Sequence, residues 1–182
     1  MQDSVLLKIV KEAIEEELYG KSIDRGLYYS LYPKLKEKVA TFVTINKRGS
    51  LRGCIGSLVA HRPFLEDLIE NAKSAAFKDP RFSPLSKEEY ESGELDIEVS
   101  ILTQPKPLEY SDIEDLKSKI RVGIDGVILT LKGYRATFLP QVWEQLPTFE
   151  SFFAHLCLKA GLSGECLKEH PKIEVYEVKK VK

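Results

Sequence analysis

The stretch VATFVTINKRGSLRGCIGSL, residues 39–58, decides the fold class. Its first eight residues are rich in β-branched and aromatic side chains, which favour a strand. The short turn KRG ends at Gly49, which can adopt a positive φ angle, and SLRGCIGSL at residues 50–58 is the expected return strand. We therefore predict an antiparallel hairpin in which residues 39–46 pair with residues 51–58.

The segments on either side of this hairpin do not follow the regular strand–helix alternation of a parallel sheet. Apolar residues at helical spacing predict four helices, and alternation, turn signals and capping boxes predict the other elements. The four helices are expected across residues 5–18, 63–77, 112–120 and 149–160. A Ser111–Glu114 capping box opens the third of them, and a Ser86–Glu89 capping box opens a short fifth helix. Strands are expected at residues 94–103, three times within 121–140, and at 172–178, and RGLYYSLYP (25–33) is expected to be a loop. This order predicts an α+β fold with mainly antiparallel sheet.

Composition excludes several classes of protein. The 182 residues fit one domain or two small lobes that share a core. With 27 basic and 28 acidic residues the formal net charge is -1, which argues against dedicated nucleic-acid or membrane-surface binding. The first twenty residues are too charged for a signal peptide, and no apolar run has the ~20 residues of a membrane span.

The cysteine pattern favours free, reduced thiols. Cys54, Cys157 and Cys166 are odd in number and show no pairing motif, so we expect reduced thiols and a cytoplasmic location. Cys157 lies on the apolar side of its predicted helix, which predicts a structural role and low reactivity. No metal-ligand or cofactor motif is recognisable, so neither a metal nor a cofactor is expected.

The hairpin's return strand carries the strongest chemical signal. In an extended strand Arg52 and Cys54 share a face, roughly 6 to 7 Å apart. That distance would favour a thiolate beside a guanidinium, and the amides of Gly53 and Gly56 could receive an anion or an oxyanion. The alternative is a buried Cys54 on a glycine-kinked strand, with Arg52 paired to a carboxylate.

Two further observations bear on this choice. A cysteine nucleophile needs a positioned base, and His61, His155 and His170 stand at no diagnostic spacing. Asp79 and Arg81 flank a proline, so a stiff turn holds both side chains. They form either a structural ion pair or the wall of an anion site opposite Arg52.

Six motifs, in this order along the chain, carry a resemblance to a known family: LRGCIG, AAFKDPRF, EVSILTQPKPL, VGIDGVIL, LPQVW and LCLKAGL. With them the chain resembles the AMMECR-one domain family across residues 5–178, although GLSGECL (161–167) departs from the prolines and tryptophan common in relatives. The resemblance implies one domain over residues 1–182, with two unequal, intimately packed lobes of antiparallel sheet flanked by helices.

The family has no settled activity, so the resemblance leaves enzymatic and regulatory roles both open. Our leading hypothesis is an enzyme or binder of a small anionic ligand, with Cys54 as nucleophile or thiol carrier and Arg52 as its partner. The ligand-binding candidates are Leu51, Gly53, Ile55, Gly56, Asp79 and Arg81. The alternative is a non-catalytic adaptor that docks a Memo-like protein or a radical-SAM enzyme, the partners that the resemblance implies.

Overall fold

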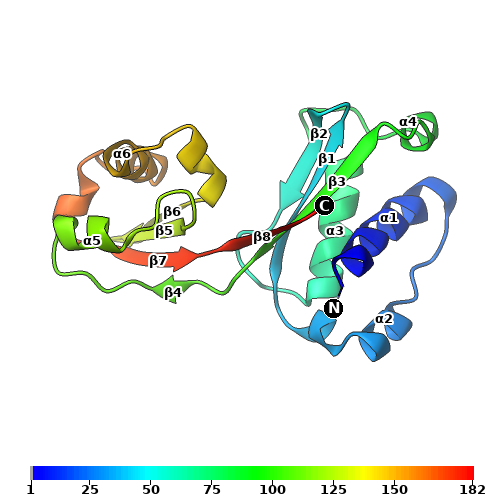
Figure 1. Ribbon diagram of the computed structural model, residues 1–182, viewed down its shortest axis with the longest axis horizontal. Coiled ribbons are helices and arrows are strands. Elements are labelled where there is room, and N and C mark those ends of the chain that lie inside the picture. Colours follow the sequence, from blue (N-terminus) through cyan, green and yellow to red (C-terminus); the bar gives the residue numbers. More distant parts are fainter. Residues whose placement is uncertain (1) are drawn as a thin grey trace. The chain divides into compact units, whose positions relative to one another are not determined.

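The computed structural model describes residues 2–182, which form two compact units. The first comprises residues 2–102 together with residues 179–182, and the second residues 103–178. Each unit is built on a four-stranded antiparallel sheet with helices against it, so the predicted α+β class is confirmed (Figure 1). Within the described residues, no helix combines the length and the apolar composition that crossing a bilayer requires.

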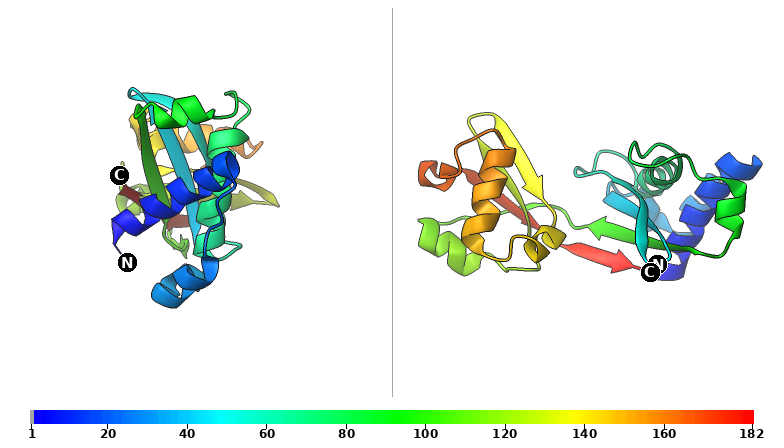
Figure 2. Two further views of the ribbon diagram at one scale, coloured as in Figure 1. Left: turned by 90° about the vertical axis from the view of Figure 1, so that its right-hand side faces the viewer. Right: turned by 90° about the horizontal axis from the view of Figure 1, so that it is seen from above.

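The first unit places two helices on one face of its sheet (Figure 2). The strand order is β2-β1-β3-β8, and the long helices α1 and α3 contact one another and the sheet. These apolar helix faces bury side chains such as Ile9, Leu65 and Leu68 completely. The elements are α1 (Asp3–Tyr19), α2 (Arg25–Leu31), the 3₁₀ helix η1 (Pro33–Lys36), β1 (Ala40–Lys47), β2 (Ser50–Gly56), α3 (Phe64–Phe77), α4 (Lys87–Glu91), β3 (Leu95–Leu102) and β8 (Val178–Val181).

The second unit has the strand order β4-β7-β5-β6 and a core built mainly by the apolar side of α6. Phe152 of α6 is fully buried and stacks on Trp143 with ring centroids 3.6 Å apart. The elements are β4 (Lys106–Pro107), α5 (Ile113–Lys119), β5 (Gly126–Leu131), β6 (Tyr134–Phe138), η2 (Pro140–Glu144), α6 (Phe149–Lys159), η3 (Cys166–Glu169) and β7 (Lys172–Tyr176).

The predicted hairpin is confirmed. β1 and β2 pair antiparallel, with Val43 opposite Ile55 and Thr44 opposite Cys54. Gly49 in the connecting turn has a φ of 79°, the conformation that an L side chain rarely adopts.

Four details of the expected secondary structure are wrong. The tyrosine-rich segment is not a loop but helix α2, capped by Asp24, whose side chain accepts from the Leu27 amide. Residues 121–140 hold two strands rather than three, because Asp125 accepts from the Arg121 amide and closes a turn before β5. The expected closing strand is split into β7 and β8, and the cap of α5 is Asp112 rather than its neighbour.

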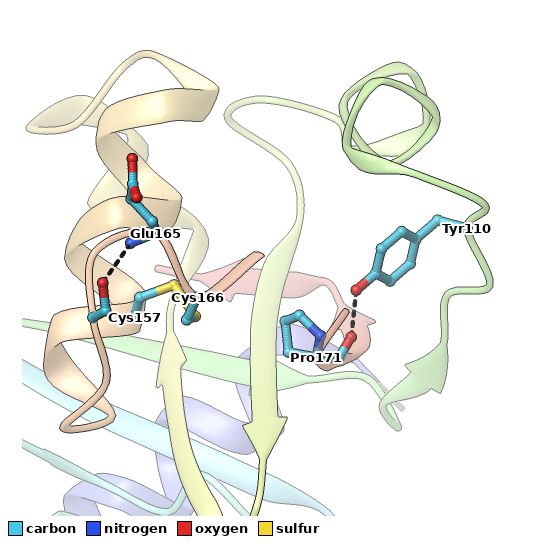
Figure 3. The surroundings of a disulfide bond; sticks show 6 residues. Tyr110, Cys157, Glu165, Cys166 and Pro171 are labelled. Carbon is cyan, nitrogen blue, oxygen red and sulfur yellow. Dashed lines mark hydrogen bonds between the residues drawn. A yellow bond between two sulfur atoms is a disulfide. The ribbon is translucent and has the colours of Figure 1, made fainter. Parts of the chain in front are cut away.

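The expectation of three reduced thiols is also wrong. Cys157 of α6 and Cys166 of η3 form a disulfide, and both are almost fully buried (Figure 3). Cys157 does lie inside the core, as its helical position predicts. Cys54 is the free cysteine. The bond fastens the turn after α6 to the helix itself, across a sequence separation of nine residues.

Replacing both bonded cysteines by alanine should lower the free energy of unfolding of the second unit by about 2–3 kcal/mol, the loop-closure contribution of a short disulfide loop. Trp143 lies in the same core cluster, so its fluorescence during urea unfolding measures the loss. Cys54→Ala is the matched control, and it should leave the Trp143 transition where it is. An unchanged midpoint in the double variant would show that the bond contributes nothing to stability.

Candidate functional site

A β-bulge in β2 decides where the candidate side chains lie. Asn46 pairs with Leu51 and the next residue back, Ile45, pairs with Gly53, so Arg52 is an extra residue without a partner in β1. A bulge interrupts the alternation of side chains and turns one of them in a new direction. Strict alternation, which predicts Arg52 beside Cys54, therefore does not hold at this residue.

The Arg52 side chain binds groups outside the hairpin instead of the Cys54 thiol. Its Nε and Nη2 donate to the two carboxylate oxygens of Glu89 at 2.8 and 3.0 Å, and Nη2 also donates to the Ser83 carbonyl at 2.8 Å. The guanidinium lies over the Phe82 ring, and only 12% of the side chain is exposed. The prediction that Arg52 pairs with the Cys54 thiolate is thus wrong, and its alternative, a pair with a carboxylate, is found.

The Arg52–Glu89 pair should make stability depend on pH. Hydrogen bonds from Arg52 outweigh burial and lower the pKa of Glu89 from 4.5 to about 2. A lowered pKa contributes stability that is present above 4.5 and is lost as the pH falls towards 2. Glu89→Gln should therefore cost about 3 kcal/mol at pH 7, a difference that shrinks as the pH falls to the folded pKa.

Urea unfolding at a series of pH values measures this dependence. Glu114→Gln, on the exposed surface of α5, is the control and should change stability little at any pH. A cost of Glu89→Gln that stays constant down to pH 2 would contradict the assigned ion pair.

Cys54 is half-buried and its sulfur lies 3.3 Å from the Thr44 hydroxyl on the neighbouring strand. The backbone of Cys54 points away from β1. Its amide donates to Asp79 at 2.9 Å, and its carbonyl accepts from Arg81 at 3.2 Å. The two side chains thus occupy the hydrogen-bonding groups that the edge strand would otherwise leave open.

Asp79 and Arg81 are brought to Cys54, but as a closed ion pair. Nε and Nη2 of Arg81 donate to the Asp79 carboxylate at 3.0 and 2.8 Å, and so does the Arg81 amide at 3.1 Å. These bonds from Arg81 hold the pKa of Asp79 well below its usual range, although the carboxylate is buried. The guanidinium charge of Arg81 is therefore largely neutralised, while 55% of its side chain remains exposed.

The two glycines of the strand face parts of the chain itself. A Cβ on Gly53 would lie 2.1 Å from the Ala75 carbonyl oxygen in α3. A Cβ on Gly56 would lie 2.2 Å from the Phe42 ring and 2.5 Å from the Thr41 carbonyl oxygen. Their small size lets a helix and a ring pack against β2, so the chain itself fills the space beside each glycine that the sequence assigns to an anion. Of the remaining candidates, Leu51 is exposed and Ile55 packs against the core.

A buried polar cluster beside this strand was not recognised from the sequence. The fully buried carboxylate of Asp67 accepts from the Thr41 amide and hydroxyl, from Ser57 and Asn71, and from Nε of Arg62. These bonds join β1, the residue after β2 and the first turns of α3. The available signal was a pair of polar residues, Asp67 and Asn71, spaced by four and in line with Ala75 on the apolar face of the helix.

Partly accessible side chains of the first unit's sheet lie on the face opposite α1 and α3. Val43 and Val99 are fully buried in the helix-facing core, so their neighbours along each strand point to the other side. We call this side the outer face; it comprises Phe42, Thr44, Cys54, Glu98 and Ser100. Its centre is a row across three strands, in which Thr44 lies opposite both Cys54 and Glu98.

The outer face lacks the groups of a thiol enzyme. Across residues 2–182, Thr44 is the one side chain that hydrogen-bonds the Cys54 sulfur. Glu98 is held by Lys180 and Lys182 at 3.3 and 2.9 Å. His61 and His155 bond backbone carbonyls near their own positions, and His170 stacks on Tyr110. The arrangement can present a surface, but it does not assemble a nucleophile with a base.

Comparisons with known proteins agree on one family. The AMMECR1 family model matches residues 7–181. A protein of Methanothermobacter thermautotrophicus is 42% identical over 176 residues, covering 94% of this chain and 88% of its own. A protein of Sulfolobus acidocaldarius is 40% identical over 182 residues, covering 94% of this chain and 77% of its own. Among solved structures, the uncharacterized protein PH0010 from Pyrococcus horikoshii matches with a TM-score of 0.76 and 36% identity, covering 97% of this chain and 88% of its own.

Proposed function

The chain belongs to the AMMECR1 family, and from this premise we propose that it is a non-catalytic binding protein whose outer face docks a protein partner. One observation carries the proposal: the groups that would activate Cys54 already have partners inside the fold. Arg52 is held by Glu89, and Arg81 by Asp79. The partner class that the family resemblance implies is a Memo-like protein or a radical-SAM enzyme.

The character of the outer face supports docking. An aromatic ring, a thiol, two hydroxyls and the Glu98 carboxylate lie on this surface of β-strands, all of them half-buried. The two long helices α1 and α3 pack on the other side of the sheet, so they leave this face to other contacts (Figure 1). Half-apolar surfaces with a few polar groups are typical of recognition sites between proteins.

A second candidate function rests on Arg81. Its side chain is 55% exposed, and its Nη2 donates to the Cys54 carbonyl at 3.2 Å, so the guanidinium lies beside the cysteine. A small anionic ligand could then bind the thiol and the free edge of this guanidinium. Arg81, rather than Arg52, would be its clamp.

Iodoacetamide labelling of Cys54 tests the two candidates against each other. For a docking protein we expect Cys54 to be labelled at pH 7 no faster than a model thiol. The labelling rate should then change by less than about twofold in Arg81→Gln and in Arg52→Gln. Labelling about tenfold faster than the model thiol that slows in Arg81→Gln alone would favour the small-ligand site instead.

Docking itself is measured by isothermal titration calorimetry with a purified Memo-like protein. Thr44→Arg puts a large charge in the centre of the outer face and should weaken binding at least about tenfold, as expected for an interface core. Ser30→Arg, on the exposed side of α2, is the control and should leave the affinity unchanged. Equal affinities for both variants would overturn the proposal.

A further inference from the structure

A groove lies between α1 and α2, two elements that do not contribute to the outer face. It encloses about 420 Å³, within the range of small-molecule pockets. One wall is a stripe of α1 that carries Lys8, Glu12 and Glu15, and the other is a stripe of α2 that carries Leu27 and Leu31. One wall is thus charged and the other apolar.

The apolar wall is left exposed. Leu27 and Leu31 lie one turn apart on α2 and are 53% and 59% exposed. Tyr28 and Tyr32 lie beside them with ring centroids 6.5 Å apart, and Tyr28 is almost fully buried. An apolar body of a ligand would remove the leucine side chains from water and contact the tyrosine rings.

The charged wall favours a cation. The groove is lined by three carboxylates, Glu12, Glu15 and Asp24, against two ammonium groups. Lys21 is tied to Glu15 at 2.7 Å, whereas Glu12 is 3.7 Å from Lys8, near the limit of an ion pair. The remaining strong contact of Glu12 is the Tyr28 hydroxyl, which donates at 2.8 Å and orients the carboxylate. A positive ligand group would therefore find an oriented carboxylate and nearby aromatic rings.

We infer that this groove binds a small organic cation with an apolar body, its ammonium group at Glu12 and its body against Leu27 and Leu31. The inference does not depend on the proposed docking function, since none of these residues belongs to the outer face. The probes that test it share one body and differ in charge: 3-phenylpropylammonium, 3-phenylpropan-1-ol and 3-phenylpropanoate.

Methyl NMR of the full chain follows each titration. We expect the Leu27 and Leu31 signals to shift, and the ammonium to bind about tenfold more tightly than the carboxylate. Glu12→Gln keeps an acceptor for Tyr28 but removes the charge, so it should bring the two affinities together. Leu31→Ala should weaken all three probes, while Leu158→Ala, an equally exposed leucine at 58% on α6, should change none.

Four results would overturn the inference. They are the absence of any shift up to the solubility limit, equal affinity for the three probes, preference for the anion, and shifts confined to residues outside the groove. Binding that survives Leu31→Ala unchanged would equally exclude the apolar wall as the contact surface.

Discussion

Asp67→Ala is expected to lower the free energy of unfolding by about 3–5 kcal/mol, the cost of removing one partner from a buried charged network. The Asp67 carboxylate is fully buried and accepts five hydrogen bonds, from a backbone amide, two hydroxyls, an amide side chain and a guanidinium. Without it the Thr41 amide and the Thr41 and Ser57 hydroxyls lose their buried acceptor, and the Arg62 guanidinium loses its counter-charge. Urea unfolding followed by far-ultraviolet circular dichroism measures the loss.

Two further variants show whether charge or volume matters at this position. Asp67→Asn keeps the volume but turns an NH₂ group towards donors, so most of the loss should persist. Glu70→Ala on the same helix removes a carboxylate that is 45% exposed and lies 3.5 Å from the Lys78 ammonium. Because this is a surface ion pair, its loss should change the free energy of unfolding by less than about 1 kcal/mol. A fully stable Asp67→Asn would contradict the network as described.

Local patterns were sufficient to predict most of the elements. The hairpin, β3, α3 and α6 each follow from a periodicity or a turn residue that lies within the element itself. The errors arose where contacts with another segment determine the local structure. The tyrosine-rich stretch reads as a loop by composition, but Asp24 caps it as a helix and Tyr28 is buried against α1. The disulfide joins residues whose proximity depends on how the turn after α6 folds back.

The candidate site was predicted less well than the fold, for a related reason. The sequence places Cys54, Asp79 and Arg81 in one candidate site, and these three residues do lie together in the structure. Their roles depend on contacts between distant parts of the chain. Arg52 meets a carboxylate 37 residues away, after a bulge. An isolated glycine in a strand can mark such a bulge, but it does not tell which partner the redirected side chain will reach. The glycines look permissive in sequence, but the space that they leave is already occupied.

Gly53→Ala should therefore destabilise the protein by about 3 kcal/mol or more, although it adds a single methyl group. The new Cβ would lie 2.1 Å from the Ala75 carbonyl oxygen, and 3.1 Å from its carbon. Both atoms belong to the backbone of α3, so no side-chain rotation relieves the overlap. Either the helix moves away from β2 or the edge strand separates from β1, and both lose buried apolar contact.

Gly26→Ala is the matched control, because its Cβ would meet only the Asp24 carboxylate at an ordinary 3.5 Å. Gly26 lies within α2, where alanine is the better helix former, so this variant should be stabilised by up to about 1 kcal/mol. The two variants are compared by the midpoints of their urea unfolding, measured on the purified proteins with no ligand or partner added. If the glycine of LRGCIG served to admit a ligand, Gly53→Ala would keep the midpoint of the unsubstituted chain. A large fall in the midpoint of the free protein instead identifies Gly53 as the contact that lets α3 pack on β2.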